Sequence, residues 1–137
     1  MEKAVYWFTK AAEQGMATAQ WYLGKCFSEG EGVPKDMEKT AYWCAKAAEQ
    51  GDATYQYDLG NMFYEGKGVS KDMEKAAYWY TKAAEQGFAM AQCNLGFAYY
   101  NGEGVPKDRG KAVYWFTKAA NQGNVEAQDN LRKLQYQ

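Results

Sequence analysis

The chain has 137 residues, of which 47% are hydrophobic and 17% aromatic, a composition that supports a packed core and argues against intrinsic disorder. Its formal net charge of −1 gives no electrostatic basis for binding nucleic acid or an anionic membrane surface. Histidine is absent, which removes the commonest general base and metal ligand, and no apolar run is long enough to cross a bilayer.

A repeat of 36 residues runs through the whole chain. The pair Tyr-Trp occurs at positions 6–7, 42–43, 78–79 and 114–115, so successive copies are 36 residues apart. The segment Ala-Ala-(Glu/Asn)-Gln-Gly keeps the same spacing. A period of roughly 20 to 50 residues is typical of stacked-repeat architectures. We therefore predict a single repeat domain over residues 1–137, with repeats at 1–36, 37–72, 73–108 and 109–137.

Each repeat opens with an amphipathic helix, which residues 37–48 illustrate. The apolar positions 37, 41, 44 and 48 follow helical spacing, and the charged residues lie off this stripe. Asp36 and Asp72 precede such helices as N-caps, and Gly51 and Gly87 follow as left-handed stops. We call these four helices the B helices. Their tryptophans lie on the widened core stripe, which favours a core role over a cofactor or sugar platform: Trp7, Trp43, Trp79 and Trp115.

A second helix follows a short turn in each repeat, which makes the two helices antiparallel neighbours. We call these the A helices; one is expected from Ala53 to about Glu65, and the others begin at Ala17, Ala89 and Val125. The pairs give eight helices in all. Gly24, in a repeated Leu-Gly pair, costs its helix about 1 kcal/mol relative to Ala, which implies that another helix approaches its backbone. The repeated glutamines are expected to bind a neighbouring backbone group: Gln20, Gln56, Gln92 and Gln128.

The glycine-rich segments 30–36, 66–72 and 102–108 connect each A helix to the next B helix. A phosphate-binding loop would follow a strand, whereas these follow helices and occur three times, so a connector is the better interpretation.

The two ends of the array differ. Arg132 replaces the glycine of the Leu-Gly pair in the last copy, which predicts a C-terminal capping helix. Met1 aligns with Met37, so the chain starts at the first residue of a B helix. We expect the packing face of that helix (Ala4, Trp7, Phe8 and Ala11) to be partly uncovered, which favours end-to-end self-association or a fragment of a longer array.

The combination of Tyr-Trp-x-x-Lys-Ala-Ala-Glu-Gln-Gly, Ala-x-x-Gln-x-x-Leu-Gly and Gly-x-Gly-Val-x-Lys-Asp resembles the Sel-one-like repeat (SLR) family, a relative of the tetratricopeptide repeats. The resemblance covers the whole chain. It implies an all-α fold, a right-handed α/α superhelix (solenoid) of antiparallel helix pairs, and a role as an adaptor or scaffold in protein–protein interaction.

One branch of that family is rich in cysteine, and the resemblance implies a disulfide between residues eight positions apart in each repeat. Here those positions hold Ala12 and Gln20, Ala48 and Gln56, and Ala84 and Gln92. The bridge is therefore absent, and a hydrolase activity of the cysteine-rich kind is the least favoured function.

Candidates for catalysis are scarce, so we expect no catalytic residue, no metal site and no cofactor. Ser28 and Ser70 have no histidine partner. The three cysteines form neither a disulfide framework nor a zinc pattern. Cys26 and Cys44 align with core residues, whereas Cys93 occupies a position of changing polarity and is expected to be the most accessible.

Function is expected on the face of the A helices that changes between copies. Positions 18, 21, 22 and 25 share a face because they follow helical spacing, and by resemblance the A helices line the concave side. Large aromatic and polar side chains there have the composition of an interaction surface rather than of neutral drift. The predicted partner-binding residues are Trp21, Tyr22, Lys25, Tyr57, Asp58, Asn61, Tyr64, Asn94, Phe97 and Tyr100.

The sequence thus favours a non-enzymatic scaffold that binds a peptide or protein segment in the groove of the A helices, with no nucleic acid and no direct membrane insertion. The alternative is a structural stacking or spacer array. The lack of a visible signal peptide, membrane segment or disulfide framework favours the cytoplasm, and a signal trimmed from a longer precursor stays open.

Overall fold

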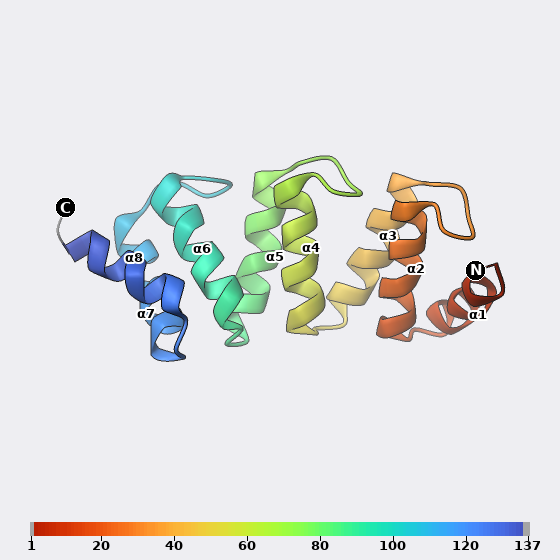
Figure 1. Ribbon diagram of the computed structural model, residues 1–137, viewed down its shortest axis with the longest axis horizontal. Helices are drawn as coiled ribbons and strands as arrows, with labels where there is room; N and C mark the ends of the chain where they lie inside the picture. Colours follow the sequence, from red (N-terminus) through yellow and green to blue (C-terminus); the bar gives the residue numbers. More distant parts are fainter. Residues whose placement is uncertain (1, 136–137) are drawn as a thin grey trace. The chain divides into compact units, whose positions relative to one another are not determined.

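The computed structural model describes residues 2–135, and over these residues it contains eight helices and no strand (Figure 1). The predicted all-α pattern is confirmed. The B helices are α1 (Glu2–Glu13), α3 (Met37–Glu49), α5 (Met73–Glu85) and α7 (Arg109–Asn121). The A helices are α2 (Ala17–Glu29), α4 (Ala53–Glu65), α6 (Ala89–Asn101) and α8 (Val125–Gln135). Met1, predicted as the first residue of a B helix, lies outside the described residues.

The predicted helix caps at Asp36 and Asp72 are present, and Asp108 forms a third cap. The carboxylates of Asp36, Asp72 and Asp108 each accept a hydrogen bond from the backbone N–H three residues later, at 3.0–3.1 Å. Such a bond satisfies one of the donors that the first helical turn leaves free. Gly51 and Gly87 have φ angles of +100° and +90°, a conformation that favours glycine and ends the B helices as predicted.

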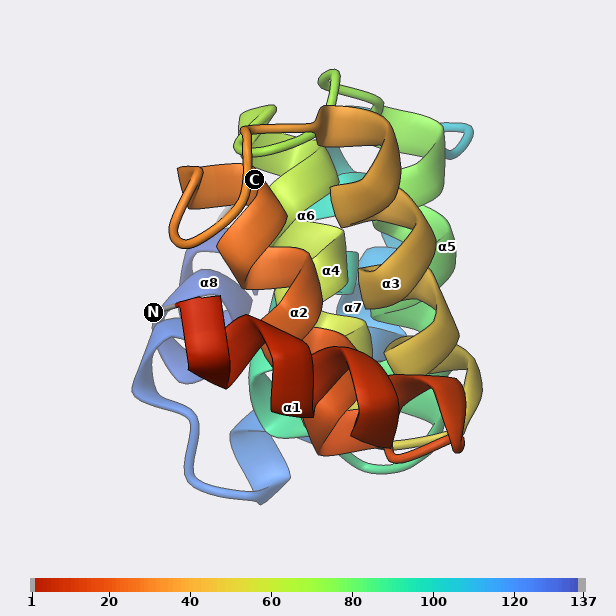
Figure 2. The same cartoon turned by 90° about the vertical axis from the view of Figure 1, so that its right-hand side faces the viewer.

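The chain forms two compact units, Met1–Lys71 with α1 to α4 and Asp72–Gln137 with α5 to α8. In the first unit α1 lies across α2 (Figure 2), and α2 packs against α3. The buried side chains that α1 and α2 contribute are Val5, Ala12, Ala19, Leu23 and Cys26. The prediction that residues 1–137 act as one domain stays a prediction.

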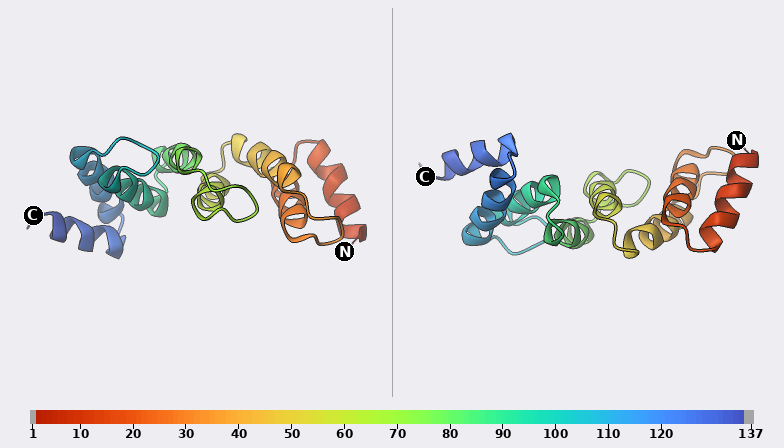
Figure 3. Two further views of the ribbon diagram at one scale, coloured as in Figure 1. Left: turned by 90° about the horizontal axis from the view of Figure 1, so that it is seen from above. Right: turned by 90° about the horizontal axis from the view of Figure 1, so that it is seen from below.

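The second unit repeats the same packing order, with α6 between α5 and α7, and α8 against α7. In both units a long loop links an A helix to the following B helix, and Figure 3 shows these loops beside the helix ends that they join. The buried core of α6, α7 and α8 consists of Cys93, Ala112, Phe116, Ala119, Ala127 and Leu134.

The glycine of the Leu-Gly pair is a point of close helix approach, as predicted. A Cβ atom built on Gly24 in α2 would lie 2.5 Å from Sγ of Cys44 in α3. A Cβ atom on Gly96 in α6 would lie 2.7 Å from the ring of Phe116 in α7. Only a residue without a side chain lets these helices pack so closely.

The repeated glutamines join turns to helices. The side-chain N–H groups of Gln20, Gln56, Gln92 and Gln128 each donate to a backbone carbonyl eight residues earlier, at 3.1 Å. The predicted structural role is confirmed. Each glutamine and the residue eight positions earlier occupy the two positions where the cysteine-rich branch is expected to form a disulfide. In this chain a hydrogen bond joins them instead.

A second glutamine extends this link to the next repeat. Gln50, at the end of α3, donates to Oε1 of Gln20 at 2.8 Å and to the carbonyl of Gly15 at 2.7 Å. Gln122 makes the same two bonds to Gln92 and Gly87, each at 2.9 Å. Within each unit, the turn of one repeat is therefore tied to the end of a B helix in the following repeat.

Candidate partner-binding face

Within the first unit, the A helices α2 and α4 present the variable positions. Tyr22 is 52% exposed and stacks on Phe8 of α1, with 5.6 Å between the ring centroids. The Lys25 ammonium lies 5.6 Å from the centroid of the Trp21 ring, within the range of a cation–π interaction. Tyr22 and Lys25 are three residues apart, so they lie on the same side of α2.

The expectation that Trp21 is exposed is wrong. Its side chain is only 7% exposed and stacks on Tyr55 of α4, with 5.3 Å between the centroids. The hydroxyl of Tyr55 also donates to Oγ1 of Thr18 at 3.1 Å. The physical reason is that Tyr55 of α4 reaches Trp21 and Thr18 of α2, so a residue beside the exposed stripe becomes buried.

Half-buried polar groups of α4 continue the face. Burial raises the pKa of the Asp58 carboxyl above its usual range, and the nearby Lys25 opposes this shift. Tyr57 and Asn61 are half-buried, and Tyr64 is 41% exposed. The first unit therefore carries aromatic, cationic and acidic groups along α2 and α4, with Lys25 near Asp58.

Within the second unit, three predicted residues lie on α6. Asn94, Phe97 and Tyr100 are half-buried. Phe97 and Tyr100 line a pocket of about 90 Å³ between α6, α7 and α8. Phe97 also meets Phe116 edge-on, with 5.1 Å between the ring centroids. Two of the predicted residues thus belong to a concave site.

Sequence analysis missed the part of this pocket that α8 contributes. The remaining lining residues are Phe116 of α7 and Asn130, Lys133 and Leu134 of α8. Asn130 and Lys133 are the fourth copies of the variable positions occupied by Asn94 and Phe97. Extending the comparison of copies to the last repeat, instead of interpreting it only as a cap, would have found them.

Asn130 carries a buried donor without a partner among the described residues. Its side-chain nitrogen is shielded from solvent and makes no hydrogen bond there. Such groups are rare in folded proteins, because an unpaired buried donor costs about 1–3 kcal/mol. One residue of the pocket lining therefore carries an unsatisfied hydrogen-bond donor.

The cysteines are free and buried, which corrects one expectation. Cys26 and Cys44 lie in the core as predicted. Cys93 was expected to be accessible but is only 2% exposed, because it belongs to the core that α7 and α8 complete. Burial and the nearby Glu126 raise the pKa of its thiol to about 12, which disfavours the reactive thiolate.

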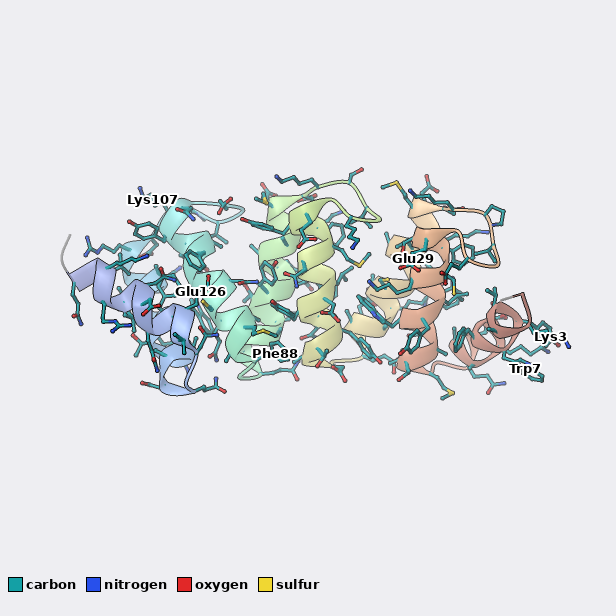
Figure 4. All side chains as sticks on the ribbon, in the orientation of Figure 1. Lys3, Trp7, Glu29, Phe88, Lys107 and Glu126 are labelled. Atoms are coloured by element: carbon teal, nitrogen blue, oxygen red, sulfur yellow. The ribbon has the colours of Figure 1, made fainter. Side chains whose placement is uncertain are left out.

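The tryptophans of the B helices are buried to different degrees. Trp79 is 7% exposed, Trp43 and Trp115 are half-buried, and Trp7 is 66% exposed. Figure 4 shows Trp7 extending away from α1, so this end face is partly uncovered as expected. Each preceding tyrosine meets its tryptophan edge-on, at 5.0–5.3 Å between centroids.

The described part of the chain holds neither a metal cluster nor a membrane-spanning helix. No group of three or more cysteine or acidic side chains in residues 2–135 is arranged to hold a metal ion. No helix in this range is both long and apolar enough to cross a membrane.

Solved structures resemble this chain closely. A protective antigen of uropathogenic Escherichia coli with an SLR fold is 40% identical, with a TM-score of 0.78 over 90% of this chain and 27% of the antigen. The chain thus spans about a quarter of that protein. A Sel1 repeat protein from Oxalobacter formigenes is 38% identical, with a TM-score of 0.76 over 92% of this chain and 95% of its own. Cysteine-rich protein B of Helicobacter pylori is 29% identical, with a TM-score of 0.65 over 94% and 92% of the two chains.

Comparison with curated protein sequences gives no match. The family model for the Sel1 repeat, in contrast, matches residues 1–16, 17–52, 53–88 and 89–124. It places the start of each full repeat at an A helix rather than at a B helix. The repeat motifs, the helix pairs and the solved relatives agree, and the chain belongs to the Sel1 repeat family, whose members usually serve as scaffolds for protein–protein interaction.

Proposed function

We propose that this chain is a non-enzymatic scaffold that binds a peptide or protein segment through its A helices. One observation carries the proposal. At equivalent positions of otherwise repeated helices, the exposed or half-buried side chains differ in chemistry: Tyr22, Asp58, Asn94 and Asn130 at one position, and Lys25, Asn61, Phe97 and Lys133 at another. A solvent face under no demand would carry small polar residues instead, whereas aromatic and charged groups are enriched where proteins bind.

The chemistry of the buried groups supports a role without catalysis. The potential nucleophiles Cys44 and Cys93 are buried with thiol pKa values raised to about 12, so the thiolate is disfavoured at neutral pH. On the A-helix face, Tyr22 stacks on Phe8, Lys25 lies over the Trp21 ring and Phe97 meets Phe116. These are packing contacts and not pairs of a nucleophile with a general base. Binding by shape and charge is the function that this arrangement supports best.

The test first selects peptide ligands and then substitutes residues of the A-helix face. Peptides would be selected from a display library on the whole chain, and their affinity measured by fluorescence anisotropy. The double variant Tyr22→Ala/Lys25→Glu changes the face in the first unit, and Phe97→Ala changes it in the second. We expect a loss of about tenfold or more in at least one of them, as for a residue central to an interface.

A matched control comes from the B helices. Tyr42 is 54% exposed, and the Lys46 ammonium lies 5.1 Å from its ring centroid, so it reproduces the exposure of Tyr22 on the opposite helix type. Tyr42→Ala/Lys46→Glu should change affinity less than about twofold. An equal loss in this control, or a library that yields no ligand, would contradict the proposal.

A stacking or spacer array is the second candidate, and the exposure of Trp7 favours it. An exposed tryptophan on a repeat face is suited to pairing with another copy. Sedimentation velocity at rising concentration would show association that Trp7→Glu abolishes. A monomer at high concentration would count against this candidate and leave the binding scaffold in place.

A further inference from the structure

The pocket of the second unit has room for one apolar side chain. Its volume of about 90 Å³ is smaller than the roughly 150 Å³ of an engineered cavity that binds benzene, so an aliphatic side chain fits better than an aromatic one. Phe97, Phe116 and Leu134 supply apolar lining. Filling such a space regains the dispersion contacts that its walls lack.

The unpaired amide of Asn130 defines what else the occupant must offer. Asn130 lines the same pocket, and its side-chain nitrogen is covered and unpaired. A rotation of this side chain would bring the nitrogen to the pocket, where a bound molecule that presents an oxygen would accept its hydrogen bond. A neutral carbonyl suits this place better than a carboxylate, because burying a charge costs more than burying a neutral dipole.

Lys133 defines the charge beside the pocket. It is one helical turn after Asn130, lines the pocket, and is exposed. The neighbouring cations are engaged: Arg132 pairs with Asp129, and Arg109 donates to the carbonyl of Leu134. Within residues 2–135 no carboxylate forms an ion pair with Lys133. An exposed ammonium of this kind attracts a solvated carboxylate.

From these three features we propose that the α6–α8 pocket binds an extended peptide with an aliphatic residue followed by an acidic one. The aliphatic side chain fills the pocket, the peptide carbonyl accepts a hydrogen bond from Asn130, and the acidic side chain pairs with Lys133. This inference rests on the proposed function and adds to it the chemistry of the ligand.

The first unit does not offer the same combination. The positions equivalent to Phe97, Asn130 and Lys133 are Lys25, Asp58 and Asn61. A cation replaces the aromatic wall there, and a carboxylate replaces the unpaired amide. We therefore assign this ligand preference to the second unit only.

The experiment titrates the whole ¹⁵N-labelled chain with four N-acetylated peptides and follows the amide resonances by NMR. The probes are acetyl-Gly-Leu-Asp-Gly-amide, its Leu-Asn and Gly-Asp analogues, and acetyl-Gly-Gly-Leu with a free carboxylate. The first probe should shift the side-chain NH₂ signal of Asn130 downfield. Each analogue should bind at least about fivefold more weakly, because it lacks one of the three contacts.

Variants of the chain test the same contacts from the other side. Asn130→Leu removes an unpaired donor, so it should keep the fold while weakening the first probe about tenfold. Lys133→Glu should weaken it by at least fivefold, roughly the effect of a lost charge pair. Lys118→Glu, an exposed lysine of α7, is the control and should leave affinity unchanged.

The possible failures are distinguishable. If display-selected peptides bind but Asn130→Leu and Lys133→Glu leave every affinity unchanged, this inference is overturned while the scaffold survives. If acetyl-Gly-Gly-Leu bound more tightly than acetyl-Gly-Leu-Asp-Gly-amide, the proposal that the ligand is an internal Leu-Asp segment would be overturned. Binding of the Leu-Asp probe without any display ligand would support the pocket and contradict the broader interaction face.

Discussion

The two units place large and small side chains on opposite helices at equivalent positions of the repeat. In the first unit the A helix α2 carries the large Trp21, and the B helix α3 carries the small Cys44. In the second unit the equivalent positions are reversed in size, with the small Cys93 on α6 and the large Phe116 on α7. All four side chains are at most 7% exposed.

This difference shows that variation between copies has two causes. At the position shared by Trp21 and Cys93, side-chain size changes inside a buried environment, so the change reflects packing. At the position shared by Tyr22 and Asn130, the side chains border solvent or a pocket, so the change alters what a partner would meet. Sequence comparison alone treated both positions as one recognition face.

The largest effect should come from Trp21. Trp21→Ala removes a buried ring that stacks on Tyr55, and we expect it to lower the free energy of unfolding by about 3–5 kcal/mol, the usual cost of truncating a buried aromatic residue. Cys93→Ala, at the same repeat position, removes a single sulfur atom and should cost about 1 kcal/mol. Urea denaturation followed by circular dichroism measures both; equal losses would refute the contrast between the units.

The helix contact at glycine should give the next largest effect. Gly96→Ala places a methyl group against the buried Phe116 ring, and Gly24→Ala places one against Cys44 and the α3 backbone. Each should destabilise by about 1–3 kcal/mol, because a packed core resists added volume. Thermal denaturation of the two variants would show which unit adjusts more easily.

Gly110 is the matched control for these glycines. It lies in helix α7 and is exposed, and an added Cβ would meet only the Asp108 side chain, at 3.4 Å. Gly110→Ala should therefore stabilise the chain by up to about 1 kcal/mol through helix propensity alone. If it destabilised as much as Gly96→Ala, close packing would not account for the repeated spacing of the glycines.

The glutamine links should have a smaller effect that is similar in the two units. Gln20→Met and Gln92→Met each remove the bond to a buried carbonyl and one of the two bonds that Gln50 or Gln122 donates. Because the carbonyl and the donor keep their other partners, we expect a cost of about 1 kcal/mol. Gln128→Met removes an exposed bond and should be nearly neutral. Hydrogen exchange at the turns 14–17 and 86–89 would locate the loss; a Gln128 variant as unstable as the others would argue against burial as the cause.

The smallest effect concerns the thiols. The pKa of Cys44 and of Cys93 is raised from an ordinary 9.0 to about 12, mainly by burial. The unfolded chain therefore loses these protons first, so stability is complete below pH 9 and falls as the pH rises toward 12. The double variant Cys44→Ala/Cys93→Ala should lose less stability than the wild type between pH 9 and pH 12, as measured by urea denaturation. The same loss of stability in both proteins would mean that other groups cause it.

Local charge should distinguish the two thiols. Burial raises the pKa of both thiols. Lys25 opposes this rise at Cys44, whereas Glu126 adds to it at Cys93. Glu126 lies in the first turn of α8 (Figure 4). Glu126→Gln should therefore speed thiolate formation at Cys93 and leave Cys44 unchanged, as measured by thiol-exchange rates under alkaline conditions. The same rate change at both cysteines would indicate a general loosening of the fold.

Local features could be predicted from the sequence because their causes are local. The helix periodicity, the caps at Asp36 and Asp72 and the glycine stops depend on residues within one or two turns of one another. The contact at Gly24 could also be inferred, since a helical glycine that recurs despite its cost in helix propensity indicates a close neighbouring helix. The role of Gln20 followed from its identity in every copy.

The burial of individual variable residues could not be predicted in the same way. Whether Trp21 faces solvent or Tyr55 depends on how α4 lies beside α2, and the spacing within one helix does not contain that information. The same holds for Cys93 beneath α8. The pocket at Asn130 requires three helices to leave a space unfilled, which no pattern in a single helix reveals.

The glutamine pairs also bear on how such an array changes in length. Within each unit, the donor glutamine lies 30 residues after its acceptor, so the second copy brings the partner that the first copy lacks. Duplication or deletion of one 36-residue copy inside an array would restore each of these bonds in the new register. The polar groups of the turns would therefore keep their partners when a whole copy is gained or lost, while the exposed side chains of each copy could diverge.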